Sequence, residues 1–199
     1  MKLANPVSFP PRGAWDPRLT SVACSDLTPV TTLHENEWFT VRDRGGYFTT
    51  EFRLPQVIVL PVVEDAGLVM IRVKRPVIGD VTLELPAGAI EEGERPVEGA
   101  AREFAEETGI LLSQSRFSPM APMSTSPNRM PNLTYVFKVD LSREEFERRG
   151  PHDKEVESVH YVPLHDVMSL VREGGLYVAL PVAVIASYLF GRFRNLPLK

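Results

Sequence analysis

The sequence is poor in cysteine, has no excess of positive charge and lacks long apolar runs, and each shortage argues against a class of protein. Cys24 is the one cysteine among 199 residues, so no disulfide can form within the chain. The net charge of −4 gives no electrostatic reason to expect nucleic-acid binding. No stretch reaches the roughly 18 apolar residues of a membrane span, and no apolar signal region follows Met1. We therefore expect a cytoplasmic protein that binds neither nucleic acid nor membrane.

The composition is that of a globular domain, with 43% apolar and 24% charged residues. Residues 1 to about 35 are rich in proline and lack periodicity, which predicts an extended arm. Residues 38–42 and 47–52 look like two short strands around Gly45-Gly46. We therefore predict an N-terminal arm and small β subdomain over residues 1–53, and a main domain over residues 54–199.

The main domain shows apolar strands followed by helical patterns. Alternation and apolar runs predict strands at residues 57–63, 68–73, 81–85, 133–139 and 159–162. Residues 166–173 and 180–192 read as helices, the first closed by Gly174-Gly175. Strands wrapped by helices predict an α+β fold, an α/β/α sandwich built on a mixed sheet.

An acidic segment between residues 88 and 110 carries most of the chemical information. It follows a break at Pro86-Ala87-Gly88, and Gly109 is placed to end a helix. Helical geometry projects Glu103, Glu106 and Glu107 from one face, where three carboxylates repel one another unless a cation lies among them. Oxygen ligands of this kind select magnesium or manganese. A solvated helix face is the alternative, since glutamate runs are commonly surface decoration.

The spacing of this segment resembles the signature of the Nudix hydrolases. That signature is Gly, five residues, Glu, seven residues, Arg-Glu, an apolar residue, any residue, Glu-Glu, any residue, Gly and an apolar residue. Every fixed position is filled, by Gly88, Glu94, Arg102, Glu103, Glu106, Glu107 and Gly109. Phe104 is bulkier than the aliphatic residue usual in the family.

The resemblance implies a Nudix fold and a set of site residues. It implies a Mg2+ site, with Mn2+ as the alternative, held by the Ala87 carbonyl, Glu103, Glu106 and Glu107. Glu103 and Glu107 are also expected to act in catalysis. Arg102 would orient these ligands by pairing with Glu106 or with Glu94.

Other segments resemble the ADP-ribose pyrophosphatase branch of the family. Thr82-Leu-Glu-Leu-Pro-Ala-Gly88 resembles its entry to the signature, and Val73-Lys-Arg-Pro-Val77 resembles its basic turn. Pro127 lies near a proline that marks the branch. Arg75 could hold a phosphate or a base, and Glu84 could meet a ribose hydroxyl. Alternatively, Arg75 is a surface arginine and Glu84 occupies the exposed side of a strand.

A general base must lie within hydrogen-bond reach of the attacking water. A signature glutamate could serve, or an acid of the loop His152-Asp-Lys-Glu-Val-Glu157, in which we favour Glu155 over Glu157. A solvated charge cluster would look the same. The polar loop 124–130 could line the substrate pocket, or could be plain surface.

These observations predict a metal-dependent pyrophosphohydrolase acting on a small nucleotide substrate. ADP-ribose, split into AMP and ribose 5-phosphate, is the favoured substrate. The alternatives are a sugar nucleotide, a dinucleoside polyphosphate, an oxidised nucleoside triphosphate, or a non-catalytic nucleotide sensor. The strand pair before residue 57 resembles a small sheet that swaps between subunits in relatives, which predicts a homodimer.

Overall fold

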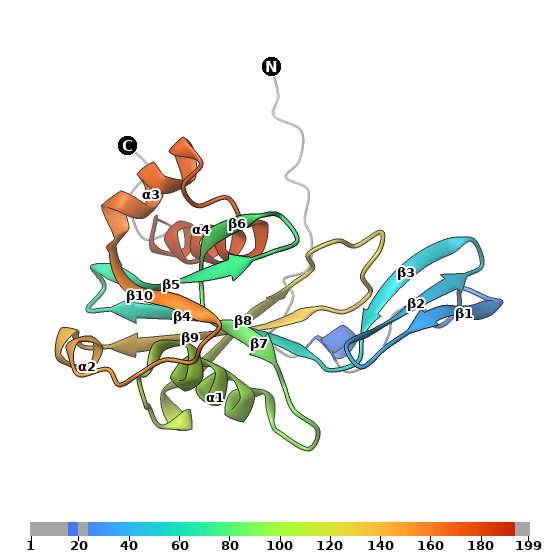
Figure 1. The fold of residues 1–199 in the computed structure, drawn as a ribbon, viewed down its shortest axis with the longest axis horizontal. Helices are drawn as coiled ribbons and strands as arrows, with labels where there is room; N and C mark the ends of the chain where they lie inside the picture. Colours follow the sequence, from blue (N-terminus) through green and yellow to red (C-terminus); the bar gives the residue numbers. More distant parts are fainter. Residues whose placement is uncertain (1–15, 20–23, 194–199) are drawn as a thin grey trace, which may run out of the picture.

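A computed structural model describes residues 16–19 and 24–193. Most of the predicted arm, residues 1–15 and 20–23, lies outside the described residues. The described chain forms a small three-stranded sheet beside a larger seven-stranded sheet with helices on both faces (Figure 1). None of the helices in the described ranges is long and apolar enough to cross a membrane.

The larger sheet is mixed, as the sequence predicted. Its path runs β10-β5-β4-β9-β8, with β6 paired to β5 and β7 paired to β4. The β4–β9 pair is parallel and the other pairs are antiparallel. The strands are β4 (Gln56–Val63), β5 (Gly67–Arg75), β6 (Asp80–Glu84), β7 (Ala87–Ala89), β8 (Ser118–Met123), β9 (Thr134–Leu141) and β10 (Val156–Pro163).

Helices cover both faces of this sheet, which confirms the α/β/α sandwich. Helix α1 (Pro96–Thr108) packs on one face, and α3 (Leu164–Glu173) with α4 (Ala179–Phe193) packs on the other (Figure 1). A short helix, α2 (Arg143–Glu147), follows β9. Strand β4 directs alternate side chains into the two cores, so that its apolar run has no polar face.

The N-terminal sheet is an antiparallel meander of β1 (Val30–Glu35), β2 (Phe39–Arg44) and β3 (Tyr47–Phe52). The predicted turn at Gly45-Gly46 is present, and both glycines have positive φ. The prediction of an arm up to residue 35 is wrong for β1. All six residues of β1 are exposed, so alternation of polar and apolar residues does not reveal the strand, which is held by its backbone pairing with β2.

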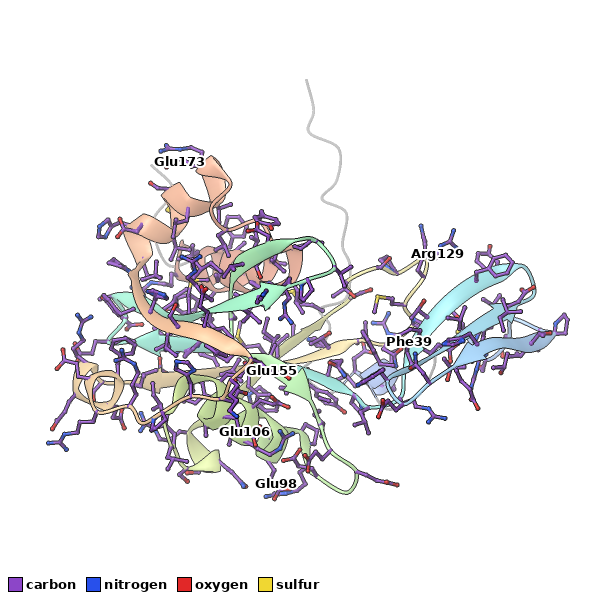
Figure 2. All side chains as sticks on the ribbon, in the orientation of Figure 1. Phe39, Glu98, Glu106, Arg129, Glu155 and Glu173 are labelled. Atoms are coloured by element: carbon purple, nitrogen blue, oxygen red, sulfur yellow. The ribbon has the colours of Figure 1, made fainter. Side chains whose placement is uncertain are left out.

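The loop between β8 and β9 joins the two sheets. The Thr50 amide donates to the Arg129 carbonyl at 2.7 Å, and the Phe52 amide donates to Asn132 Oδ1 at 3.2 Å. Figure 2 shows Arg129 beside the N-terminal sheet. The loop 124–130 therefore lies against β3, and the predicted boundary after residue 53 falls between the two sheets.

Candidate functional site

Helix α1 is fixed at both ends by local chemistry. Pro96 occupies its first turn, and the Arg95 amide donates to Glu98 Oε2 at 2.9 Å. Gly109 ends the helix with φ of 71°, a conformation that glycine adopts without strain. Phe104, fully buried, anchors the inner face, so the bulkier residue at this signature position is accommodated in the core.

The glycine loop packs directly on a glutamate of α1. A Cβ atom placed on Gly88 would lie 2.1 Å from the carboxyl carbon of Glu103. Only glycine therefore fits at position 88 while Glu103 keeps its place. Burial is the main cause that raises the pKa of Glu103 above its ordinary value, and hydrogen bonding from Arg102 opposes it.

Glu107 is the most buried carboxylate of the helix, with 7% of its surface exposed. Its Oε2 accepts a hydrogen bond from the Ala87 amide at 2.7 Å. Burial raises the pKa of Glu107 to about 8, and the negative charges of Glu103 and Asp153 add to the effect. A proton or a cation is therefore favoured at this carboxylate.

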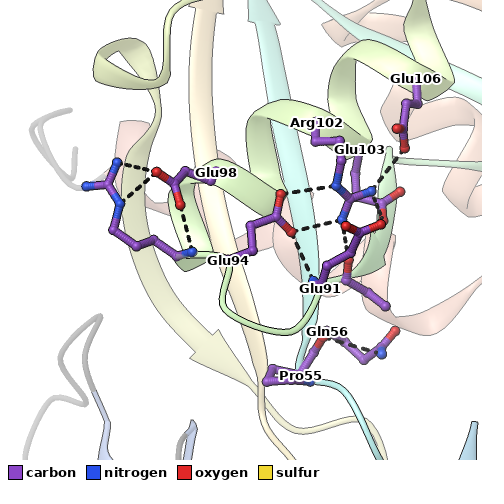
Figure 3. A network of polar contacts seen from close by, with 10 residues as sticks. Pro55, Gln56, Glu91, Glu94, Glu98, Arg102, Glu103 and Glu106 are labelled. Atoms are coloured by element: carbon purple, nitrogen blue, oxygen red, sulfur yellow. Dashed lines mark hydrogen bonds and ion pairs between the residues drawn. The ribbon is translucent and has the colours of Figure 1, made fainter.

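Arg102 is the hub of the polar network drawn in Figure 3. Its Nε and Nη2 donate to the two carboxylate oxygens of Glu94 at 3.1 and 3.0 Å, and Nη2 also donates to the Ala89 carbonyl at 2.7 Å. Its Nη1 donates to Glu103 at 2.9 Å and to Glu106 at 3.0 Å. Arg102 thus binds both predicted partners, Glu94 and Glu106, and ties the glycine loop to the helix.

The three helix glutamates occupy different environments. The side chain of Glu106 is 50% exposed and that of Glu103 is 15% exposed, whereas Glu107 points to the Ala87 amide. Within the described ranges, no group of three or more His, Cys, Asp or Glu side chains is arranged to hold a metal ion. In the described chain, the three carboxylates therefore do not converge on one point.

The donor set nevertheless suits a hard divalent cation in its chemistry. All the candidate ligands are oxygen atoms. Glu103 and Glu106 already accept from one nitrogen, Arg102 Nη1, so their oxygens converge. The raised pKa values of Glu103 and Glu107 show that burial and mutual repulsion disfavour their charges, which a cation would offset.

Arg75 and Glu84 form a pair on the same side of the sheet. Arg75 Nε and Nη2 donate to Glu84 at 2.8 and 3.0 Å, and Thr82 Oγ1 donates to Glu84 at 2.5 Å. Glu84 is buried, so it does not occupy an exposed strand position, whereas 45% of the Arg75 side chain is exposed. Burial favours a higher pKa for Glu84, but the bonds from Arg75 and Thr82 lower it below its ordinary value.

The loop before β10 is brought against the C-terminal end of α1. The Asp153 amide donates to the Glu106 carbonyl at 2.8 Å. Glu155 is exposed, and its charge is among those that raise the pKa of Arg75, after the dominant hydrogen bonds with Glu84. Glu157 instead pairs with Arg72 at 3.3 Å.

Sequence reasoning missed two residues of this region, Thr82 and Asp153. Thr82 holds the buried end of Glu84, and its hydroxyl also reaches the Val73 carbonyl. Nothing in a strand pattern marks such a hydroxyl. Asp153 could have been found, because an aspartate two residues before Glu155 is typical of a turn in which the carboxylate accepts backbone amides.

Cavities are present elsewhere in the molecule. One of about 670 Å³ lies between β6, β10 and α3, lined by Arg72, Leu83 and Asp166 among others. It opens on the face of the sheet that carries α3, not on the face that carries α1. The candidate site is therefore defined by its carboxylates and by the glycine loop.

The protein combines an α/β/α sandwich with a glycine loop that packs against a helix of buried and half-buried glutamates. This combination defines the class to which the protein belongs. The family model of the NUDIX domain matches residues 52–178. The chain belongs to the Nudix family, which confirms the resemblance read from the signature.

Individual relatives agree with this assignment. The chain is 30% identical over 123 residues to a Bacillus subtilis (strain 168) protein named ADP-ribose pyrophosphatase, covering 62% of this chain and 65% of that protein. It is 32% identical over 114 residues to an Escherichia coli (strain K12) protein named phosphatase NudJ, covering 57% and 72%. The match to the Bacillus protein thus spans less than two thirds of that protein's length.

A solved structure described as the crystal structure of an ADP compounds hydrolase shares the fold. Its TM-score is 0.64, and the superposition covers 83% of this chain and 94% of that one. The two sequences are 21% identical, so this similarity concerns the fold alone.

Proposed function

We propose that this protein is a divalent-metal-dependent hydrolase that cleaves the diphosphate of a nucleoside diphosphate derivative. ADP-ribose, split into AMP and ribose 5-phosphate, is the proposed substrate. The observation that carries the proposal is the buried Glu107, which accepts a hydrogen bond from the Ala87 amide and lies near Glu103; among the described residues no cationic side chain is hydrogen-bonded to it. The Bacillus relative that bears the name ADP-ribose pyrophosphatase supports the choice of substrate.

In this proposal the Ala87 carbonyl, Glu103, Glu106 and Glu107 hold Mg2+, or Mn2+ in its place. Such an ion would offset the charge of the diphosphate and lower the pKa of a bound water. Arg102 has the contacts to keep Glu103 and Glu106 oriented, since it binds both.

We assign Arg75 and Glu84 to substrate binding and Glu155 to proton transfer. Arg75 would bind a phosphate through the part of its guanidinium that Glu84 leaves exposed. Glu84 acts in substrate binding through Arg75, whose direction it fixes. Glu155 is the proposed general base that takes the proton from the attacking water, because the hydrogen bond of the Asp153 amide holds its loop against the C-terminal end of α1. Glu157 is less well placed, since Arg72 holds it.

We also infer a homodimer and a cytoplasmic location. The N-terminal sheet exposes large apolar side chains, among them Leu33 at 53%, Trp38 at 66% and Phe48 at 52%. Large apolar side chains left exposed on one small sheet favour a protein interface there. The single Cys24 suits a reducing compartment. Sedimentation of the purified protein tests the dimer, and a monomer at micromolar concentration would contradict it.

The decisive experiment is a substrate panel read by product identity. The purified protein is incubated with Mg2+ and with ADP-ribose, a sugar nucleotide, a dinucleoside polyphosphate and an oxidised nucleoside triphosphate, and a parallel reaction contains excess chelator. We expect metal-dependent release of AMP and ribose 5-phosphate from ADP-ribose. Release of pyrophosphate from the triphosphate alone would instead select the triphosphate alternative. Nucleotide binding without any product would select the sensor.

A further inference from the structure

The segment Gly150–Val156 is docked on the end of α1 by its backbone. The Gly150 amide donates to the Gly109 carbonyl at 2.7 Å, and the Asp153 amide donates to the Glu106 carbonyl at 2.8 Å. A Cβ atom on Gly109 would lie 2.2 Å from the Gly150 carbonyl oxygen, so the close approach requires glycine there. The segment is thus attached to the C-terminal end of the helix that carries the candidate ligands.

Asp153 also organises the residues that follow it. Its Oδ1 accepts from the Glu155 amide at 3.0 Å and from the Val156 amide at 3.2 Å. One residue therefore holds α1 with its own amide and closes a turn with its carboxylate. Val156, buried in the core at the start of β10, fixes the far side of this turn.

The turn decides where Glu155 lies. Within the described part of the chain, no hydrogen bond to the Glu155 carboxylate is present, so its place is set by its backbone rather than by a side-chain partner. That backbone is held by the carboxylate of Asp153 on its own amide and on that of Val156. A general base needs its carboxylate within about 3 Å of the proton it removes.

We infer that Asp153 is a positioning residue, which holds Glu155 beside α1 for the attack on the diphosphate. The inference rests on the proposed function, in which Glu155 takes the proton. It concerns the acceptor oxygen of Asp153 and not its negative charge, because the oxygen closes the turn.

Two substitutions separate the acceptor from the charge. Asp153→Ala removes the acceptor, whereas Asp153→Asn keeps an acceptor oxygen and removes the charge. We expect Asp153→Ala to lower kcat for ADP-ribose roughly ten- to a hundredfold with KM changed less than threefold, since misplacing a reacting group by about 1 Å has effects of that size. Asp153→Asn should restore most of kcat. Ser142→Ala, which removes the hydroxyl that caps α2, is the matched control for a lost capping bond and should keep full kcat.

A double substitution and a hydrogen-exchange measurement test whether Asp153 acts through Glu155. In a Glu155→Gln background, Asp153→Ala should lower kcat less than threefold further, because the base is already absent. Amide hydrogen exchange over residues 151–157 should accelerate in Asp153→Ala and not in Asp153→Asn, which checks the turn without using activity.

The inference is overturned if Asp153→Ala and Glu155→Gln lower kcat additively when they are combined. It is also overturned if Asp153→Asn fails to restore activity, or if Glu155→Gln leaves kcat unchanged. Absence of any hydrolysis by the unmodified protein would overturn the proposed function itself and is distinct from these results.

Discussion

Two glutamates with equal exposure, Glu51 in the N-terminal sheet and Glu107 in α1, have opposite electrostatic environments. Each exposes 7% of its surface. Glu51 accepts hydrogen bonds from Arg44 at 2.6 and 3.0 Å and from Thr49 at 2.8 Å. Burial favours a higher pKa for Glu51, but these bonds lower it, whereas the pKa of Glu107 is raised to about 8.

The difference shows that burial alone does not mark a functional carboxylate. Glu51, like Glu84, has its own arginine, and such a pair is complete within the fold. Glu107 accepts a hydrogen bond from the Ala87 amide and lies near acidic groups, and the charge of Arg75 offsets its burial only in part, so a bound cation would stabilise its charged form. Substitutions at the two positions should therefore affect different properties.

The largest effect is expected from Glu107→Gln. We expect kcat to fall roughly 10²- to 10⁴-fold, the range typical for loss of a group that acts in the reaction. The metal-free protein should keep its melting temperature at neutral pH, because a carboxyl with a pKa of about 8 is largely protonated there and glutamine is its neutral counterpart. Steady-state kinetics and thermal melting measure the two properties. Glu144→Gln on α2, where Glu144 pairs with exposed Arg148, is the control; equal activity in both variants would remove Glu107 from the mechanism.

The next largest effect is expected from Glu51→Gln, which should lower stability rather than activity. This change leaves the buried guanidinium of Arg44 without its anion, and breaking a buried pair typically costs about 3–5 kcal/mol. Denaturant unfolding monitored by tryptophan fluorescence measures the free energy of unfolding. A loss of unfolding free energy below about 1 kcal/mol would show that the Arg44–Glu51 pair contributes no more to stability than an exposed ion pair.

A smaller effect is expected from Gly88→Ala. The added methyl group must displace the Glu103 carboxylate, so Mg2+ affinity measured by calorimetry should weaken and kcat should fall roughly tenfold. Gly191→Ala is the matched control, since nothing lies within 4 Å of a Cβ atom there and Gly191 lies in α4. Unchanged metal affinity in Gly88→Ala would separate the glycine loop from the metal site.

The smallest effect, taken per pH unit, is a pH dependence of stability in the metal-free protein. The folded state raises the pKa of Glu107 from 4.5 to about 8, so it binds more protons than the unfolded state between these values. Stability should therefore fall as pH rises through this window, by on the order of 1 kcal/mol per pH unit, and level off above it. Unfolding at several pH values with chelator present measures the slope. Glu107→Gln should remove this contribution, and an unchanged slope would contradict the raised pKa.

Sequence patterns predicted the sandwich, the acidic helix and the glycine loop because these follow from short-range rules. Gly109 ends the helix through its own φ, and the spacing of Glu103, Glu106 and Glu107 is a property of any helix. β1 was missed because an exposed strand has no apolar alternation to read. The site assignments themselves stay predictions, although the structure brings most of these residues to one face of the sheet.

What the sequence determined alone is the family and the positions of Glu103, Glu106 and Glu107 on one helix, since both follow from spacing along one segment. The tertiary structure decided in which direction burial and neighbouring groups shift the pKa of Glu84, Glu103 and Glu107, and how each carboxylate is held. The amide of Ala87 meets Glu107, Arg75 closes on Glu84, and Asp153 ties its loop to α1. Each contact joins segments that only strand register and packing bring together, and a buried charge is stable or unstable according to the neighbours that the fold supplies.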